Sequence, residues 1–165
     1  ILRERPDVQS VVHVHPEFSV LLTVLGKRLR PLSPEASLLL LDPIPVYQHQ
    51  KIVTTEAEGA ELAQVLGNSP AAMLFGHGTV TVGSSVEESV TRILQLEYAA
   101  KMNYYAYSAA GPNYPRIPQD LVDEAFYHTI PFSELPHFQG QNAEQHRGQG
   151  NAIFNHYAEI VSRDL

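Results

Sequence analysis

Apolar and polar positions alternate along the chain in short blocks that predict strands separated by helices. The run 11–15 is rich in β-branched residues and is closed by Pro16, which is typical of a buried strand. Two further apolar runs, 71–75 and 79–83, have the length of strands, and residues 45–47 form a shorter one. Because strands and helices alternate, the pattern by itself favours an α/β domain with a parallel sheet.

Two helices and one ambiguous segment are predicted in the first half of the chain. Residues 18–25 are nearly all apolar and precede Gly26, so we expect a buried helix that ends at this glycine. Thr55 and Glu58 have the spacing of a capping box and open an amphipathic helix. The apolar run 37–41 fits either a helix or a strand.

A third and longer helix is predicted from a serine cap, Ser84 or Ser85, as far as Gly111. Its apolar stripe consists of Val86, Val90, Ile93 and Leu94. Its distal portion carries the large side chains of Met102, Tyr104, Tyr105 and Tyr107. These side chains fit either ordinary packing or a subunit interface, where tyrosine is enriched.

Beyond this helix the chain becomes more polar. Residues 112–118 contain three prolines and are interpreted as a linker, and residues 119–129 as a short helix. A polar segment rich in Gln and Gly, 131–150, is expected to be a loop or tail, and 151–164 an amphipathic helix.

The chain is therefore divided into two parts, a core of residues 1–111 and a C-terminal part of residues 112–165. The core opens with residues 1–7, which look like the last turn of a helix closed by Arg5-Pro6. We therefore expect that the beginning of this helix lies outside the chain.

The composition indicates a globular domain. Of the 165 residues, 44% are apolar and 18% are charged, and no apolar run approaches the roughly 20 residues that span a bilayer. The net charge of −7 and the lack of a basic cluster argue against a nucleic-acid or anionic-membrane surface. The chain has no cysteine, so any metal must be held by His, Asp, Glu or water, which is compatible with a cytoplasmic enzyme.

Three histidines form the strongest candidate for a chemical site. His13 and His15 lie one residue apart on the first predicted strand, so both rings leave the same face. His77 lies between Gly76 and Gly78, where the backbone can turn sharply. An isolated His-x-His pair more often packs or is solvated than binds metal. Three neutral imidazoles with an open fourth position, however, match a catalytic zinc site.

A series of motifs runs in order through the first 110 residues of the chain. They are Arg5-Pro6-Asp7, Val11-Val12-His13-Val14-His15-Pro16, Ile44-Pro45-Val46-Tyr47, Gly76-His77-Gly78 with Gly83, and Glu97-Tyr98-Ala99-Ala100. In these motifs the chain resembles the class II aldolase/adducin family. The resemblance implies a three-layer α/β/α sandwich with a mostly antiparallel central sheet. It also implies a homotetramer with active sites at the subunit interfaces.

The resemblance further implies that His13, His15 and His77 bind one divalent metal ion, usually Zn²⁺ and in some members Mn²⁺ or another ion. Such an ion binds oxygens of a small oxygenated substrate. As a Lewis acid it stabilises the enediolate or enolate that is left when a carbon–carbon bond breaks. A Schiff-base lysine is then not needed.

The residue that carries the proton is less well defined. In the sugar-phosphate aldolases of this family, an acid/base glutamate lies on a Ser-rich segment upstream of the histidine pair, which here would fall before Ile1. A tyrosine that some members use has no match near residues 33–41. The substitutes that this chain offers are Glu17, Tyr127, His128 and His137.

Three classes of function are compatible with these residues. The first is a metal-dependent carbon–carbon lyase, which acts by aldol cleavage or by decarboxylation of a hydroxylated acid, for example an aromatic one. The apolar surroundings of His15 favour a substrate without phosphate. The second is a sugar-phosphate 4-epimerase. The third is a non-catalytic, adducin-like interaction module, and such modules generally lack the three histidines. We therefore expect a lyase with a small-molecule substrate and no nucleic-acid or membrane partner.

Overall fold

The computed structural model describes residues 1–165 except 41–42, 128–133, 135, 137–142 and 164–165. It divides the chain into two compact units, Ile1–Ile117 and Pro118–Leu165. The second unit contains α5 (Gln119–Tyr127) and α6 (Ala143–Ser162). Within the described part of the chain, no helix is both long enough and apolar enough to cross a membrane.

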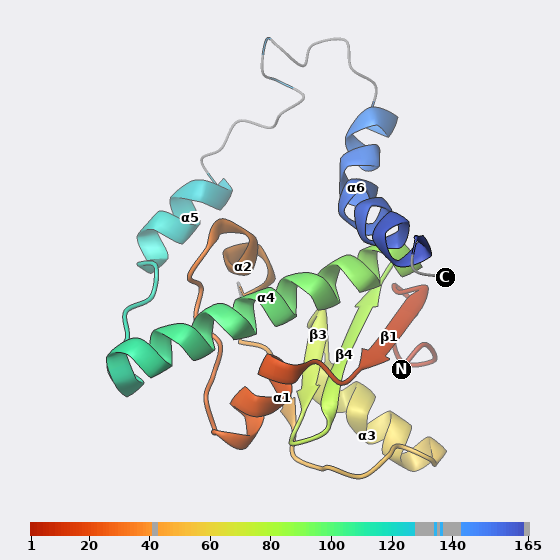
Figure 1. Ribbon diagram of the computed structural model, residues 1–165. Coiled ribbons are helices and arrows are strands. Elements are labelled where there is room, and N and C mark those ends of the chain that lie inside the picture. Colours follow the sequence, from red (N-terminus) through yellow and green to blue (C-terminus); the bar gives the residue numbers. More distant parts are fainter. Residues whose placement is uncertain (41–42, 128–133, 135, 137–142, 164–165) are drawn as a thin grey trace. The chain divides into compact units, whose positions relative to one another are not determined.

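A four-stranded sheet forms the centre of the first unit (Figure 1). Its strands are β1 (Ser10–Val14), β2 (Val46–Tyr47), β3 (Ala71–Leu74) and β4 (Gly78–Gly83). They follow the order β1-β4-β3-β2, in which β4 pairs antiparallel with β1 and β3, while β2 pairs parallel with β3. The mostly antiparallel sheet that the family resemblance implies is confirmed.

The parallel sheet favoured by the alternation of strands and helices is wrong, and the reason lies in the connections. Only residues 75–77 separate β3 from β4, and so short a turn can join only antiparallel neighbours. The strands β2 and β3 are joined through α3 (Glu56–Leu66), and this longer crossover allows their parallel pairing. The direction of a strand relative to its neighbour therefore depends on the length of the connection between them. The alternation of strands and helices does not take this length into account.

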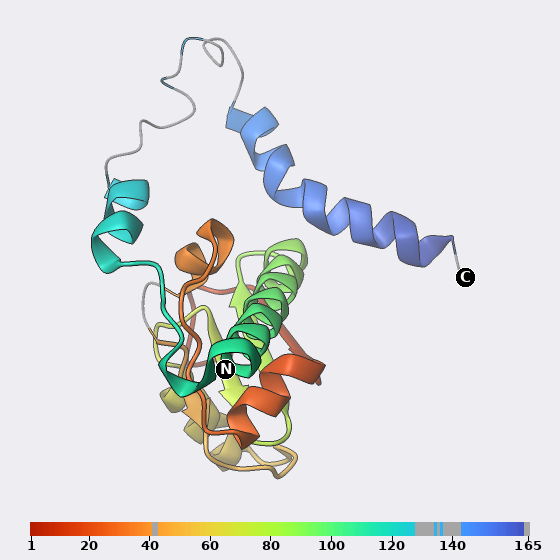
Figure 2. The same cartoon turned by 60° about the vertical axis from the view of Figure 1, so that its left-hand side comes forward.

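Helices cover both faces of the sheet and give the fold its three layers. The helices on one face are α1 (Glu17–Val24), α2 (Pro34–Leu39) and α4 (Val86–Ala110), which is followed by the short 3-10 helix η1 (Gly111–Asn113). Helix α4 contacts β1 and β4, and both α1 and α2 pack against α4. Helix α3 contacts β2 and β3 from behind the sheet in Figure 1, and Figure 2 shows this arrangement from a second direction.

Strand β3 is buried on both faces and contributes to the core on each side of the sheet. Ala71 and Met73 pack with residues of α2 and α4, whereas Ala72 and Leu74 pack with residues of α3. This alternation is that of a pleated strand. Because both faces are covered, β3 is a continuous apolar run in the sequence.

The predicted caps start two of the helices. The Thr55 side chain accepts a hydrogen bond from the Glu58 N–H while the Glu58 side chain accepts one from the Thr55 N–H, so the capping box of α3 is confirmed. Helix α4 starts after Ser85, whose side chain accepts a hydrogen bond from the Glu88 N–H. Ser84 instead donates to the Glu88 carboxylate.

The apolar stripe predicted for α4 is only partly correct. Val86 is 56% exposed, whereas Ile93 is buried. The buried positions of α4 are Ser89, Ile93, Leu96, Ala99, Ala100 and Asn103. Small and polar residues belong to this face because they let the helix lie close to the sheet, where Thr81 donates to the Ser89 carbonyl at 2.7 Å. An apolar pattern does not register such hydrogen-bonded positions.

The structure corrects the expected burial of one segment in the first half of the chain and decides between helix and strand for another. The apolar run that forms α1 is exposed at its C-terminal end, at Val24 and Leu25, so the expected burial is wrong there. The ambiguous run beside it forms α2, because Ser33 caps a helix that has Pro34 at its first position. Leu41, the last residue of that run, lies outside the described residues.

The second unit corrects one prediction. Residues 143–150 are helical and begin α6, so the loop predicted over 131–150 is wrong for this stretch. Most of its charged and amide residues are good helix formers, and polarity alone does not indicate a loop. The apolar side of α6 is exposed at Ile153, Tyr157, Ile160 and Val161.

Candidate metal centre

The three histidines lie at one edge of the sheet. The strands β1 and β3 run in the same direction because each is antiparallel to β4, so their C-terminal ends lie together. His13 lies on β1, where it pairs with Val80 of β4, and His15 directly follows β1. His77 lies in the turn between β3 and β4, where Gly76 has a φ of 59°, a left-handed conformation that suits glycine.

The imidazole rings form a compact triangle. The ring centroids of His13 and His15 are 5.0 Å apart, those of His13 and His77 are 5.1 Å apart, and those of His15 and His77 are 4.9 Å apart. One ring nitrogen from each residue lies within 4.8 Å of the other two. Zinc–nitrogen bonds of about 2.1 Å place tetrahedral ligands about 3.4 Å apart. Small rotations of the rings therefore suffice for the three to share one cation.

His13 is oriented by a backbone partner. Its Nδ1 donates to the carbonyl oxygen of Thr79 at 3.1 Å, so its Nε2 faces the Nε2 of His15, in hydrogen-bond contact at 3.2 Å. Partial desolvation of the ring lowers the pKa of His13, and the nearby His77 and His15 add to this effect, while the hydrogen bond to Thr79 opposes it. The lowered pKa favours the neutral imidazole, which is the form that binds metal.

Two further observations fit a cation at this point. The Nδ1 of His77 is buried and has no hydrogen-bond partner among the described residues, which is costly unless another group binds there. Gly78 provides the space in which the rings meet. A Cβ atom at this position would lie 2.7 Å from the Cδ2 of His15 and 2.8 Å from the Cε1 of His13. Only glycine therefore lets the turn approach the histidine pair this closely, and an all-imidazole donor set suits zinc and similar ions.

The histidine triangle opens onto a cavity of about 400 Å³. The rest of its lining is apolar and consists of Ile1, Val11, Ile52, Val53, Leu62, Leu74 and Val80. Among the residues that the structure describes, no Lys or Arg lines this cavity. Such walls suit the apolar body of a ligand, while His13 and His15 themselves are exposed.

The remaining predicted site residues are not part of this group. Glu17 lies in the first turn of α1 and is exposed. It does not belong to the metal-compatible group that the described residues form, which consists of the three histidines. The Tyr127 side chain, and the whole of His128 and His137, lie outside the described residues.

Glu97 on α4 is a site-related residue that the sequence argument placed in a motif without identifying its role. Its carboxylate accepts hydrogen bonds from the backbone N–H groups of Phe18, at 2.7 Å, and Ser19, at 2.9 Å. These groups belong to the first turn of α1, whose N-cap is Pro16 and has no side-chain cap. A helix that starts at a proline cap leaves N–H groups without acceptors, and this is the signal from which such a partner could have been inferred.

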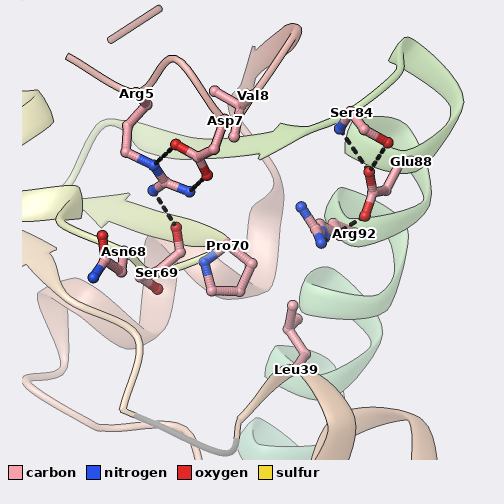
Figure 3. Close-up of a pocket in the computed structure, with 10 residues that line it drawn as sticks. All are labelled: Arg5, Asp7, Val8, Leu39, Asn68, Ser69, Pro70, Ser84, Glu88 and Arg92. Atoms are coloured by element: carbon pink, nitrogen blue, oxygen red, sulfur yellow. Dashed lines mark hydrogen bonds and ion pairs between the residues drawn. The ribbon is translucent and has the colours of Figure 1, made fainter.

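A larger cavity, of about 660 Å³, lies at the opposite edge of the sheet (Figure 3). Charged side chains line it, and each is paired. Arg5 binds the Asp7 carboxylate through two nitrogens, at 2.8 and 2.7 Å. Glu88 accepts hydrogen bonds from the N–H and hydroxyl of Ser84, at 2.6 and 2.7 Å, and forms an ion pair with Arg92 at 2.6 Å. These contacts tie loops and helix ends together and use the charged groups that a ligand would need.

Comparisons with known proteins agree on one family. The family model described as Class II Aldolase and Adducin N-terminal domain matches residues 1–104. The 3,4-dihydroxyphthalate decarboxylase of Terrabacter sp. (strain DBF63) is 32% identical over 127 residues, which are 74% of this chain and 53% of that protein. Gamma-adducin of Mus musculus is 30% identical over 135 residues, which are 81% of this chain and 19% of that protein.

The chain spans about half the length of the decarboxylases that it matches. Among solved structures, an aldolase II superfamily protein from Pseudomonas syringae superposes with a TM-score of 0.68. The two chains are 22% identical, and the match covers 91% of this chain and 57% of the other. At this level of identity the likeness shows the fold alone.

Proposed function

Because the chain belongs to the class II aldolase and adducin family, we propose that it carries the metal centre of a carbon–carbon lyase. The observation that supports this most directly is the triangle of His13, His15 and His77, whose ring nitrogens lie within 4.8 Å of one another. Decarboxylases and adducins both belong to the family. Membership alone therefore does not separate a catalyst from a binding module, whereas a metal centre does.

The three histidines would hold one divalent cation, with Zn²⁺ as the first choice and Mn²⁺ as the second. A cation held by neutral imidazoles and open on one side supplies Lewis-acid stabilisation of the negative charge that develops when a carbon–carbon bond breaks. The protein prepares the ligands for this role. The Thr79 carbonyl fixes the tautomer and orientation of His13, and Gly78 lets the turn bring His77 against the other two rings.

The cavity favours a small oxygenated substrate with an apolar body over a sugar phosphate. Ile52, Val53 and Leu62 are among its walls, and in the described part of the chain no cationic side chain lines it. A phosphate group placed there would lose water without gaining an ionic partner, which is costly. A hydroxylated aromatic acid fits these walls better, and the decarboxylase relatives are named for 3,4-dihydroxyphthalate. We therefore favour decarboxylation of such an acid over aldol cleavage.

The second candidate function is a non-catalytic, adducin-like interaction module. It is favoured by the similarity to gamma-adducin, because the sequence identity of this chain to gamma-adducin is close to its identity to the decarboxylase. An interaction module needs neither a bound cation nor an unobstructed cavity beside it. Metal content is therefore the property on which the two candidates differ most.

The proposed assembly is a homotetramer with active sites at the subunit interfaces. Tyr98 and Tyr105 on α4 are each 53% exposed, and the ring of Phe18 lies 6.0 Å from that of Tyr105. Exposed aromatic side chains are enriched at protein interfaces. Light scattering that gives only the mass of one chain would contradict this assembly.

Metal analysis of the purified chain and of a His77→Ala variant tests the lyase proposal. We expect near-stoichiometric Zn²⁺ or Mn²⁺ in the unsubstituted chain. Zinc affinity should fall in His77→Ala by more than the roughly 10–100-fold that loss of an outer-shell partner costs, because a direct ligand is removed. His49→Ala is the matched control, since His49 lies outside the triangle and faces Glu61. Unchanged zinc binding by His77→Ala would refute the metal centre.

Product analysis then separates the possible reactions. Release of carbon dioxide from hydroxylated aromatic acids is the result that we expect. Release of an aldehyde fragment would instead indicate aldol cleavage, and an isomer of unchanged mass would indicate epimerisation. A metal-loaded chain that turns over none of these substrate classes would contradict the lyase activity and leave only the metal centre in place.

A further inference from the structure

The first turn of α1 lies directly beside the histidine triangle, and its stability depends on another helix. His15 is followed by Pro16, which is the N-cap of α1 and makes no side-chain cap hydrogen bond. The free N–H groups of Phe18 and Ser19 donate instead to the two carboxylate oxygens of Glu97, which lies 78 and 79 residues further along the chain. The start of α1 is therefore held by α4 rather than by its own sequence.

A second set of contacts joins this turn to His13 through Thr79 of β4. Ser19 is completely buried, and its hydroxyl accepts a hydrogen bond from the Thr79 hydroxyl at 3.1 Å. The carbonyl oxygen of Thr79 is the acceptor for the Nδ1 of His13. Glu97 thus holds a residue, Ser19, whose side chain contacts the residue that orients His13.

We infer that Glu97 is a positioning residue of the His13–His15–His77 centre, an inference that rests on the proposed function. The Glu97 carboxylate fixes the first turn of α1 and thereby the direction in which the chain leaves His15. A carboxylate suits this task because it accepts two N–H donors at once and carries the charge that the N-terminus of a helix stabilises. A neutral amide can accept through only one of its two end atoms.

A cap that only stabilises the fold predicts a different result from a cap that positions a ligand. The first lowers the resistance of the chain to unfolding and leaves metal affinity unchanged once the chain is folded. The second lowers the metal affinity of the folded chain. Glu88 offers a matched comparison on the same helix, because its carboxylate also accepts a backbone N–H, that of Ser84, but lies at the opposite edge of the sheet.

The test is a titration of the metal-free chain with Co²⁺, with visible absorption of the bound ion as the readout, together with urea unfolding of the same samples. We expect Glu97→Gln to lower Co²⁺ affinity by about 10–100-fold and to change the shape of the absorption bands. Glu97→Asp keeps the charge on a shorter side chain and should show a smaller loss. Glu88→Gln should bind Co²⁺ as the unsubstituted chain does, even if it unfolds at lower urea.

The possible outcomes separate this inference from the proposed function. Co²⁺ affinity and spectra within twofold of the unsubstituted chain in both Glu97 variants would overturn the positioning role alone. Equal losses of affinity in the Glu97 and Glu88 variants would also overturn it, because the effect would then be a general one on stability. If Glu97→Gln does not fold, Glu97→Asp decides the question. An unsubstituted chain that binds no Co²⁺ would refute the proposed function, and the inference with it.

Discussion

Where β1 ends, the ring nitrogens of His13, His15 and His77 face one another with no carboxylate in the metal-compatible group formed by the described residues. Where β1 begins, Arg5 is bound to Asp7, and across the cavity of Figure 3 the other arginine is bound to Glu88. The second cavity is the larger of the two. The edges therefore differ in how completely their polar groups are paired, and unpaired groups identify a candidate site better than volume does.

The ion pairs and hydrogen bonds of the charged side chains also explain what each edge contributes to the protein. Arg5 donates to the carbonyl oxygens of Gly67 and Ser69, so it fastens the N-terminal turn to the loop between α3 and β3. Its guanidinium beside Asp7 holds the pKa of that carboxyl below its usual value. Under the proposed function, the opposite edge serves stability and the histidine edge serves chemistry, so substitutions at each edge should affect different measurements.

The largest effect is expected for Gly78→Ala at the histidine edge. The added Cβ would lie 2.6 Å from the Val14 carbonyl oxygen and within 2.8 Å of the rings of His13 and His15, so the turn and the histidine pair must separate. Overpacking of this kind typically costs about 1–3 kcal/mol of stability. Zinc affinity should fall by at least about tenfold in addition, since the ligands no longer converge. Zinc titration and urea unfolding measure the two effects.

The control for this substitution is Gly59→Ala. Gly59 lies within α3, and a Cβ there meets nothing within 4 Å. The same chemical change should therefore leave zinc binding intact and stabilise the helix by about 0.5–1 kcal/mol, because alanine is the better helix former. Retention of full zinc affinity by Gly78→Ala would show that the close approach of the turn is not needed for the centre.

A smaller effect, confined to stability, is expected for Arg5→Ala at the opposite edge. The substitution removes the hydrogen bonds to Gly67 and Ser69 as well as the pair with Asp7. Hydrogen bonds to a charged group of this type contribute about 1.5–3 kcal/mol, so a loss near 2 kcal/mol is expected in urea unfolding. Zinc affinity should stay within twofold. A large drop in zinc affinity without a change in unfolding would reverse the assignment of the two edges.

The sequence was sufficient for features that depend on neighbouring residues. The alternation at 11–15 predicts that His13 and His15 share a face, and the structure places their rings 5.0 Å apart. Gly76 beside His77 marks a tight turn because few other residues adopt its left-handed backbone, whereas Gly78 is needed for the space that it leaves. The capping box at Thr55 and Glu58 is likewise local, and the structure confirms it.

The features that the sequence did not predict depend on residues far apart in the chain. The two hydrogen bonds that Glu97 accepts span 78 and 79 residues, and the contact of Arg5 with Gly67 spans 62. The buried face of α4 includes Ser89 and Asn103, which an apolar pattern omits and whose side chains donate to the carbonyls of Ser10 and Arg30. Such contacts form only when the tertiary structure brings their partners together, so local patterns do not contain them.

The smallest effect is expected at the N-terminal cap of α3, which should lose stability in acid independently of the histidine edge. Hydrogen bonds from the Thr54 backbone, from Lys51 and from the Thr55 backbone lower the pKa of Glu58 from 4.5 to about 2. Since the folded-state pKa is the lower one, this stabilisation is fully present above pH 4.5 and is lost as the pH falls toward 2. Because imidazole binds metal in its neutral form, metal binding at the histidine edge should also weaken as the pH falls, and it is measured separately from the cap.

Thermal unfolding of the metal-free chain from pH 6 to pH 2.5 measures the cap alone. We expect the unfolding temperature of the unsubstituted chain to decrease below pH 4.5, and that of Glu58→Gln to start lower and decrease less, because the variant has no carboxyl to protonate at this position. The difference between the two chains should therefore narrow as the pH falls. A constant difference across this range would mean that the Glu58 charge does not stabilise α3, and the acid sensitivity would then belong to other carboxylates such as Asp7 at the opposite edge.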